Sequence, residues 1–310
     1  MTDRVELLRD DILLGPAALA RLFRAYEAPD SPLSAVLRSL PQAPRFAFAG
    51  MGSSRYAALL VASELRAAGT AAWVEYASTG VPGAPAADLV LVAVSASGRT
   101  PEEVGAARRH RGRSLVVAVT NDPGSALGAE ADHVLPLYAG PEGSGIATRT
   151  FRATVAVLAL LEGRSPSSLS STVADLALAI ESAEPWVTET ADAIDGAAAI
   201  DVLADASLLG LADQSALMLR EAPRLPATAH DTGDWLHTAV YLAIPGHRVL
   251  LFPGSTADDE VIATVERRGG TVITMPGAAE SDPIRRAIVG SVSAELLAGE
   301  LWRRTLAEER

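Results

Sequence analysis

The sequence predicts an α/β protein with two doubly wound parallel sheets, related by an internal duplication and preceded by an N-terminal helical arm. Three observations predict this fold. Short apolar runs rich in valine, leucine and alanine are typical of strands buried on both faces. Alanine-rich runs of helical character alternate with them, which favours parallel strands joined by crossover helices. After residue 205 the same order of runs starts again.

The first half of the chain predicts a helical arm and then five strands. Over residues 1–40, leucines and Phe23 recur at helical spacing, so this arm can pack on the body or on a second subunit. Gly69 stands where a C′ glycine ends a helix. We expect strands at 45–50, 71–76, 88–94, 114–120 and 133–137. Helices are expected at 55–68 and 152–161, with one between them that begins at Pro101 and a short one that ends at Ala131.

The second half repeats this pattern with fewer strands. A small polar segment at 163–171 is a candidate linker, and a helix at 172–195 follows it. We expect strands at 206–211, 248–252 and 271–275. Helices are expected at 214–221 and 257–268, followed by a long final helix that begins at about residue 281. The predicted organisation is an arm (1–40), a first sheet domain (41–163), a linker with a helix (164–200) and a second sheet domain (201–310).

Composition excludes several classes of chemistry. The 310 residues include no cysteine and no lysine, so disulfides, thiolate nucleophiles and lysine Schiff bases are impossible for this chain. The net charge of −12 argues against nucleic acid or an anionic membrane as partner. No apolar run reaches the roughly 18 residues of a membrane span, and the N-terminus lacks the apolar core of a signal peptide. We therefore expect a cytoplasmic protein.

No metal or cofactor site is expected. No set of histidine, aspartate and glutamate residues has the spacing of metal ligands. Asp258, Asp259 and Glu260 are better explained as acids that the helix dipole favours in a first turn.

The turn after the strand at 88–94 predicts a phosphate-binding cup. It holds the hydroxyls of Ser95, Ser97 and Thr100, and Pro101 opens the next helix. Hydroxyls and unpaired amides at a helix N-terminus bind an anion. Because the lysine of a P-loop is missing, we expect a small phosphate ester rather than a nucleoside triphosphate. An ordinary strand-to-helix turn with Thr100 as N-cap explains the same residues equally well.

A second turn of the same kind follows the strand at 45–50. Gly52, Ser53 and Ser54 lead there into a helix. Gly50 and Gly52 could also open a dinucleotide fingerprint, but Arg55 occupies the place of its third glycine. We therefore favour a second anion-binding turn.

Four short motifs follow one another along the first half of the chain. They are Gly52-Ser53-Ser54, Ser95-x-Ser97-Gly98-x-Thr100, Thr120-Asn121, and Ala139-Gly140-Pro141-Glu142 with Thr148-x-Thr150-Phe151. In order and spacing they resemble those of the tandem sugar isomerase (SIS) domains in the isomerase half of glucosamine-6-phosphate synthase and its stand-alone relatives. The resemblance covers roughly residues 45–300. It implies that Ser53, Ser54, Ser95, Ser97 and Thr100 hold the phosphate of a hexose phosphate, and that Gly52, Glu142 and Thr148 also contact the substrate.

The resemblance also implies two catalytic residues in the second half. Leu217 to Glu221 is similar to the family's Leu-Lys-Leu-Lys-Glu, whose glutamate moves a proton between sugar C1 and C2. Gly233 to His237 is similar to Gly-Glu-Leu-Lys-His, whose histidine assists ring opening from the neighbouring subunit. A homodimer with a shared active site is therefore implied. Without the resemblance, Glu221 would be assigned to an ion pair with Arg220 or Arg224, and His237 to a solvated or buried structural imidazole.

Departures from the family leave the reaction open. A lysine of the family motif is Met218 here, and another is Arg149. The catalytic lysine of the synthase's C-terminal tail has no counterpart, and without cysteine the glutaminase nucleophile is missing. We expect a hexose or amino-hexose 6-phosphate isomerase that uses C1/C2 proton transfer. The alternatives are an amino-sugar-phosphate deaminase, a sugar-amine-phosphate deglycase and a non-catalytic sugar-phosphate sensor.

Overall fold

The computed structural model describes residues 2–277 and 281–308, and it confirms the predicted α/β fold with two parallel sheets. The chain divides into two compact units, each built around one sheet. The N-unit consists of residues 15–141 and 149–173. The C-unit consists of residues 1–14, 142–148 and 174–310.

The N-unit contains a five-stranded sheet in the order β2-β1-β3-β4-β5, with every pair parallel. Ala49 of β1 lies opposite Ala93 of β3, so the carboxyl ends of these two strands are neighbours. The chain continues from β1 to β2 on one side and to β3 on the other, which makes β1 and β3 the switch point of the sheet. The strands are β1 (Arg45–Gly50), β2 (Ala72–Tyr76), β3 (Leu89–Val94), β4 (Leu115–Thr120) and β5 (His133–Pro136).

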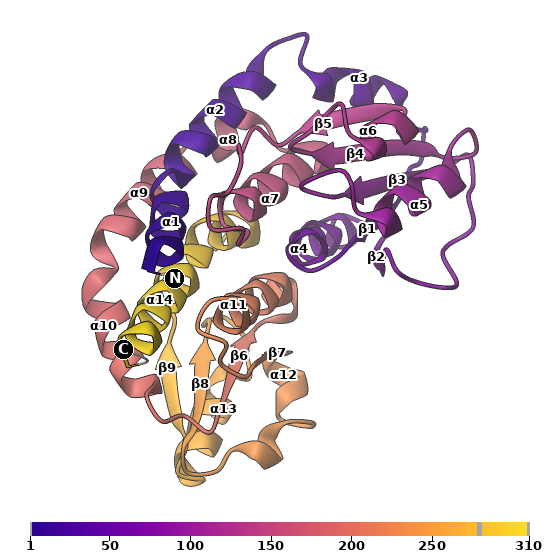
Figure 1. The fold of residues 1–310 in the computed structure, drawn as a ribbon. Coiled ribbons are helices and arrows are strands. Elements are labelled where there is room, and N and C mark those ends of the chain that lie inside the picture. Colours follow the sequence, from indigo (N-terminus) through magenta and orange to yellow (C-terminus); the bar gives the residue numbers. More distant parts are fainter. Residues whose placement is uncertain (1, 278–280, 309–310) are drawn as a thin grey trace. The chain divides into compact units, whose positions relative to one another are not determined.

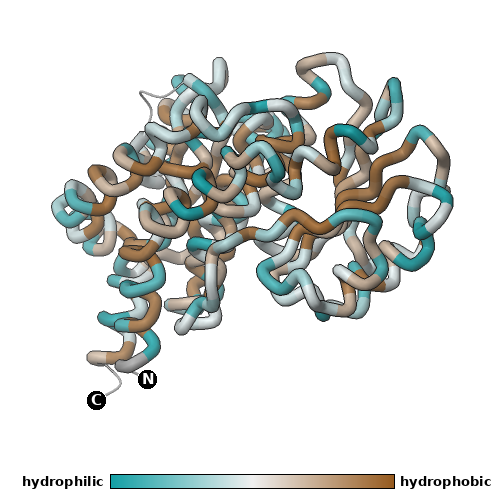
Figure 2. The backbone as a smooth tube through the Cα atoms, turned by 90° about the horizontal axis from the view of Figure 1, so that it is seen from above, coloured by the Kyte–Doolittle hydropathy of each residue, from teal (hydrophilic) through white to brown (hydrophobic). Residues whose placement is uncertain are grey.

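Helices cover both faces of this sheet (Figure 1). Helix α5 contacts α6, β3 and β4, whereas α4 packs against α7, β1 and β2. Every residue of β3 is buried, as a central parallel strand requires. Figure 2 shows the strands of this sheet in brown and their connecting loops in paler and teal colours. The helices are α2 (Gly15–Glu27), α3 (Pro32–Ser39), α4 (Ser53–Ala67), α5 (Pro101–His110), α6 (Ala126–Glu130), α7 (Arg149–Glu162) and α8 (Pro166–Leu169).

The C-unit contains a four-stranded parallel sheet in the order β7-β6-β8-β9. This order repeats that of the first four strands of the N-unit, which supports the predicted duplication. The strands are β6 (Ala199–Ala204), β7 (Ala227–Asp231), β8 (His247–Leu251) and β9 (Thr271–Thr274).

Two predictions for this sheet are wrong. The strand expected at 206–211 lies instead at Ala199–Ala204, and residues 206–208 form a 3₁₀ turn (η1, Ala206–Leu208) that leads into α11. The apolar pattern does not indicate the strand at 199–204, because the charged Asp201 lies inside this buried segment. Strand β7 was not expected, since its threonine, histidine and aspartate do not form an apolar run.

The helix expected at 172–195 is two helices, because Pro185 stands in the first turn of the second. Helix α1 packs along α14, so the two ends of the chain lie side by side in the C-unit (Figures 1 and 2). The helices of this unit are α1 (Thr2–Leu13), α9 (Thr172–Ser182), α10 (Glu184–Ile194), α11 (Leu209–Glu221), α12 (Thr232–Trp235), α13 (Asp258–Arg267) and α14 (Pro283–Glu308), with a second 3₁₀ turn η2 (Val240–Leu242).

The predicted domain boundaries at 40, 163 and 200 stay a prediction. The contacts add that the expected arm is divided, because α1 belongs to the C-unit and α2 and α3 belong to the N-unit. Among the described residues, no helix is long and apolar enough to span a membrane.

Candidate functional site

The turn between β1 and α4 leaves a helix N-terminus open. Gly52 has φ of +50°, in the left-handed region that favours glycine, and α4 begins at Ser53. No side chain caps the first turn of α4. In the part of the chain that the structure describes, the half-buried hydroxyls of Ser53 and Ser54 make no hydrogen bond. Amides and hydroxyls are therefore available to a ligand.

The turn between β3 and α5 is open in the same way. Thr100 occupies the N-cap position, but its side chain does not cap the helix. Its Oγ1 instead lies 2.9 Å from Oγ of the buried Ser95. Ser97 is exposed, and its Oγ accepts a hydrogen bond from the Arg99 amide at 3.2 Å. The ordinary capped turn that also explained these residues is therefore not the observed geometry.

Gly98 shapes the bottom of this second turn. Its φ is +64°, and a Cβ atom at this position would lie 2.0 Å from Oγ of Ser125 and 2.9 Å from Oγ1 of Thr120. The turn therefore requires glycine both for its backbone conformation and for the space that Ser125 occupies.

The two turns lie next to each other because β1 and β3 are paired in parallel. Their helix N-termini carry partial positive charge at the switch point, the part of an α/β sheet where ligands bind. We name these residues the hydroxyl cup: Gly52, Ser53, Ser54, Ser95, Ser97 and Thr100. The guanidinium of Arg99 is largely exposed and pairs with Asp122 at 3.2 Å, so the cup offers mainly hydroxyls and amides to a tetrahedral anion.

The loop at 142–148 brings two other predicted residues together in the C-unit. The carboxylate of Glu142 accepts hydrogen bonds from the amide of Thr148 at 2.6 Å and from its Oγ1 at 3.1 Å. Thr148 is fully buried and Glu142 is partly exposed. In the N-unit, the neighbouring Arg149 donates to the carbonyls of Ala139 and Pro141 at 3.2 and 2.6 Å.

Glu221 is the last residue of α11. The residue as a whole is exposed, but its carboxyl group is partly buried, and this burial raises the pKa of Glu221. The positive charge of Arg220 lowers that pKa, and the negative charge of Glu142 raises it. Arg220 donates to the carbonyl of Ala227 at 2.6 Å. Within the described residues Glu221 forms no ion pair, so the ion-pair interpretation does not account for it.

The prediction of site residues missed two polar side chains that hold the loop at 142–148. Gln214 of α11 donates from Nε2 to the carbonyl of Ala147 at 3.0 Å. Asp11 of α1 accepts hydrogen bonds from Gly143 and Ser144. Both are buried within otherwise apolar helix faces. A polar residue in an apolar stripe is the signal that could have identified them.

His237 follows α12 and is exposed. In the described chain no hydrogen bond or ion pair joins its imidazole to Glu221. The short helix before it is held firmly: Asp231 caps it, and Nε1 of Trp235 donates to the buried Asp201 at 2.7 Å. The charge of Glu142 thus acts on Glu221, whereas within the described residues no hydrogen bond or ion pair links Glu221 to His237.

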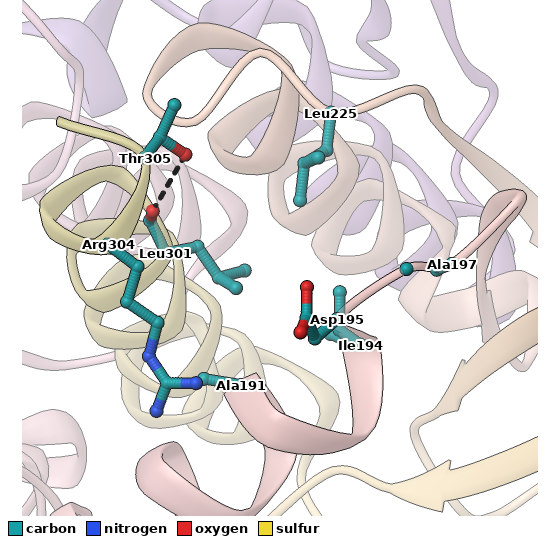
Figure 3. Close-up of a pocket in the computed structure, with 9 residues that line it drawn as sticks. Ala191, Ile194, Asp195, Ala197, Leu225, Leu301, Arg304 and Thr305 are labelled. Atoms are coloured by element: carbon teal, nitrogen blue, oxygen red, sulfur yellow. Dashed lines mark hydrogen bonds between the residues drawn. The ribbon is translucent and has the colours of Figure 1, made fainter. Parts of the chain in front are cut away.

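A pocket of about 350 Å³ elsewhere in the C-unit contains none of the predicted site residues (Figure 3). Arg304 at its edge is engaged by Asp192 at 2.6 Å and Glu300 at 2.7 Å. Within residues 2–277 and 281–308, no group of three histidine, aspartate or glutamate side chains is arranged to hold a metal ion.

Comparison of the sequence with known proteins finds one matching family and related enzymes. Residues 39–162 match the SIS domain family. Over 278 residues the chain is 31% identical to glutamine–fructose-6-phosphate aminotransferase (isomerizing) of Aeropyrum pernix, a match that covers 83% of this chain and 45% of that protein. The chain thus spans less than half the length of this relative.

Solved structures share the fold over nearly the whole chain. Glucosamine-6-phosphate deaminase of Thermotoga maritima superposes with a TM-score of 0.77 at 18% identity, covering 96% of this chain and 94% of that one. Tagatose-6-phosphate ketose/aldose isomerase of Escherichia coli gives 0.79 at 19% identity, with 97% and 93% covered. At these identities the likeness shows the fold alone, and the two neighbours carry names of different reactions.

Proposed function

The chain is a SIS-domain protein, and on this premise we propose that it is a phosphosugar isomerase. The proposed substrate is a hexose or amino-hexose 6-phosphate, whose aldose and ketose forms it interconverts. We propose further that it acts as a cytoplasmic homodimer and needs no cofactor. The observation that carries the proposal concerns the carboxylate of Glu221: its pKa is raised, and among the described residues it forms no ion pair.

The proposed reaction needs a base of intermediate strength. A proton on the sugar carbon next to a carbonyl is acidic because the resulting enediol delocalises charge onto oxygen. The carboxylate of Glu221 would take this proton from C2 and return it to C1, while a proton moves from the C2 hydroxyl to the C1 oxygen. A carboxylate whose pKa is raised is a stronger base than an ordinary one, which suits this task.

The hydroxyl cup would bind the phosphate group of the substrate. A phosphate ester carries nearly two negative charges, and helix N-termini with uncapped amides stabilise such a group. The chain has no lysine, so the cup lacks the lysine of a P-loop and a single phosphate suits it better than a nucleoside triphosphate. This anchoring would supply binding energy remote from the carbons that react.

His237 would assist opening of the sugar ring. Its imidazole is exposed in the single chain and has no hydrogen-bond partner among the described residues. That exposure fits a residue that serves the active site of a second copy, as the proposed homodimer requires. Imidazole is a common general acid and base in catalysis, because its ring can both donate and accept a proton.

Product analysis tests the proposal against its alternatives. The protein is incubated with a panel of hexose 6-phosphates, 2-amino-hexose 6-phosphates and phosphorylated sugar-amine adducts. The variant Glu221→Gln is assayed beside it, with Glu266→Gln as the control, because Glu266 is an exposed glutamate of the same unit. We expect aldose–ketose interconversion that Glu221→Gln abolishes and Glu266→Gln leaves unchanged. Release of ammonia would indicate a deaminase, and release of a larger amine from sugar-amine adducts a deglycase. Binding without any turnover would indicate a sensor.

A further inference from the structure

Helix α1 holds the loop at 142–148 through one buried carboxylate. Asp11 is only 3% exposed. Its Oδ1 accepts a hydrogen bond from the amide of Gly143 at 3.1 Å, and its Oδ2 accepts from the amide and the hydroxyl of Ser144 at 2.9 and 2.8 Å. A buried carboxylate with several N–H and O–H donors is a strong and directional anchor.

Two further residues of α1 support the same anchor. Arg4 donates from Nη2 to the carbonyl of Ser144 at 2.8 Å. Its guanidinium also lies 5.6 Å from the ring centre of Trp302 on α14. The side chain of Leu7 packs against Gly143, where an added Cβ would lie 3.1 Å from Leu7 Cδ2. The first part of the loop is therefore bound to α1 by its backbone.

The other part of the loop is bound to α11. Gln214 donates to the carbonyl of Ala147, and the carboxylate of Glu142 closes the loop onto Thr148. Gln214 stands two helical turns before Glu221, so both lie on the same side of α11. The loop thus joins α1 to the helix that carries Glu221.

Glu142 is the charged residue that this loop carries. Its negative charge raises the pKa of the Glu221 carboxyl group, and its loop is bound to α11 through Gln214. The effect of Glu142 on Glu221 depends on where the loop holds it, because the interaction of two charges weakens with distance. A loosened loop would let Glu142 move away.

We propose that Asp11 is a positioning residue for the proton transfer, which holds the loop at 142–148, and with it the carboxylate of Glu142, against α11, the helix that carries Glu221. The inference rests on the proposed function of Glu221 as the base. Asp11 itself does not touch the substrate in this account. It acts through Gly143 and Ser144 on Glu142.

The variant Asp11→Asn tests this role. Asparagine replaces one acceptor oxygen by an NH₂ group, which would face the N–H donors of the loop. We expect the pKa of Glu221 to fall toward the ordinary 4.5 of a glutamate, and kcat to fall roughly tenfold because the base is weaker and less well oriented. The acid limb of the kcat/KM profile should move to lower pH.

Asp10→Asn is the matched control, since Asp10 is the exposed neighbour on the same helix and loses the same charge. Ser144→Ala is the second variant, because it removes one donor to Asp11 without changing any charge. The pKa of Glu221 is followed independently of activity by NMR titration of protein with ¹³C-labelled glutamate side chains, with Glu221→Gln assigning the signal.

The outcomes separate this inference from the proposed function. A lowered pKa of Glu221 in Asp11→Asn and Ser144→Ala, but not in Asp10→Asn, supports the positioning role. An unchanged titration in both variants overturns it, whether or not the protein is active. An unchanged kcat in an active Asp11→Asn protein also overturns it. Failure of the wild-type protein to isomerise any sugar contradicts the proposed function alone, because the titration still decides whether Asp11 positions Glu142.

Discussion

Glu221 and Glu142 form the pair of carboxylates on which the proposed chemistry depends. Burial raises the pKa of Glu221, and the charge of Glu142 adds to that rise. The negative charge of Glu142 disfavours ionisation of its neighbour, so its removal must lower the pKa of Glu221. This sign holds whatever the substrate is.

The variant Glu142→Gln should therefore shift the acid limb of kcat/KM to lower pH. Glutamine keeps an oxygen that accepts the hydrogen bonds of Thr148, so the loop should remain closed. The measurement is the pH dependence of kcat/KM between about pH 4 and 8 for both proteins. A limb that stays in place or moves to higher pH would show that Glu142 does not act on the base.

Glu103 is a buried carboxyl group in the first turn of α5, with 2% of its surface exposed. Burial raises its pKa to about 7, its own backbone amide opposes the rise, and Glu102 adds to it. Below its ordinary value of 4.5 the group is protonated in both the folded and the unfolded chain. Above about 7 it is ionised in both, and the folded protein then carries a buried charge.

The contribution of Glu103 to the protein's free energy of unfolding should therefore fall as pH rises from about 4.5 to 7. One pKa unit corresponds to about 1.4 kcal/mol, so the loss is on the order of 2 to 3 kcal/mol. Glu103→Gln should remove this loss, whereas Glu27→Gln, at an exposed position, should not. Urea unfolding at pH 5 and pH 8 measures it. Equal pH dependence in all three proteins would refute the assignment.

At the scale of elements, the β3–α5 turn depends on Gly98. Alanine at this position would need a left-handed backbone and would place its Cβ 2.0 Å from Oγ of Ser125. Gly112 has a similar φ of +72°, but no atom lies within 4 Å of an added Cβ there. A comparison of alanine variants at these two glycines therefore separates the cost of the left-handed backbone from the cost of the clash with Ser125.

Gly112→Ala should lower the free energy of unfolding by about 1 kcal/mol, the cost of a left-handed alanine. Gly98→Ala should lower it clearly more, and should also weaken sugar-phosphate binding because the hydroxyl cup is displaced. Urea unfolding and titration calorimetry with the substrate measure the two effects. Equal stability and equal affinity in the two variants would contradict the role assigned to Gly98.

Elements with a plain apolar pattern could be predicted from the sequence, and mixed ones could not. The strand at 45–50 agrees with β1 (Arg45–Gly50), because no charged residue interrupts its buried part. Strand β6 was misplaced because Asp201 lies inside it, where Trp235 satisfies the buried carboxylate. A sequence pattern does not show such a partner, which lies far along the chain.

The site could be predicted in part for the same reason. The hydroxyl cup consists of two local turns, so its residues stand together in the sequence. The link between Asp11, Glu142 and Gln214 joins three distant segments, and only the folded chain brings them together. The roles of the cup hydroxyls, of Glu221 and of His237 stay predictions until activity is measured.

At the scale of the whole molecule, charge opposes the proposed substrate. The chain carries a net charge of −12, and a sugar phosphate is also negative. Binding therefore depends on local amides and hydroxyls against a repulsive field. Salt screens the long-range repulsion, since the Debye length is about 30 Å at 0.01 M and about 8 Å at 0.15 M.

The affinity for a sugar phosphate should consequently rise, severalfold, when potassium acetate is increased from about 10 to 150 mM. Titration calorimetry at constant pH measures the dissociation constant, and the uncharged parent sugar is the control that should show no such trend. A dissociation constant that increases with salt would mean that a local cationic site, rather than the hydroxyl cup, dominates binding.

Proton exchange at sugar C2 tests the central claim most directly. The protein is incubated in heavy water with the hexose 6-phosphate and amino-hexose 6-phosphate panel, and the C2 proton signal is followed by NMR. We predict that the wild-type protein and Glu266→Gln replace this proton by deuterium, and that Glu221→Gln does not. Exchange that persists in Glu221→Gln, or no exchange with any sugar by the wild-type protein, would contradict Glu221 as the base of an isomerase.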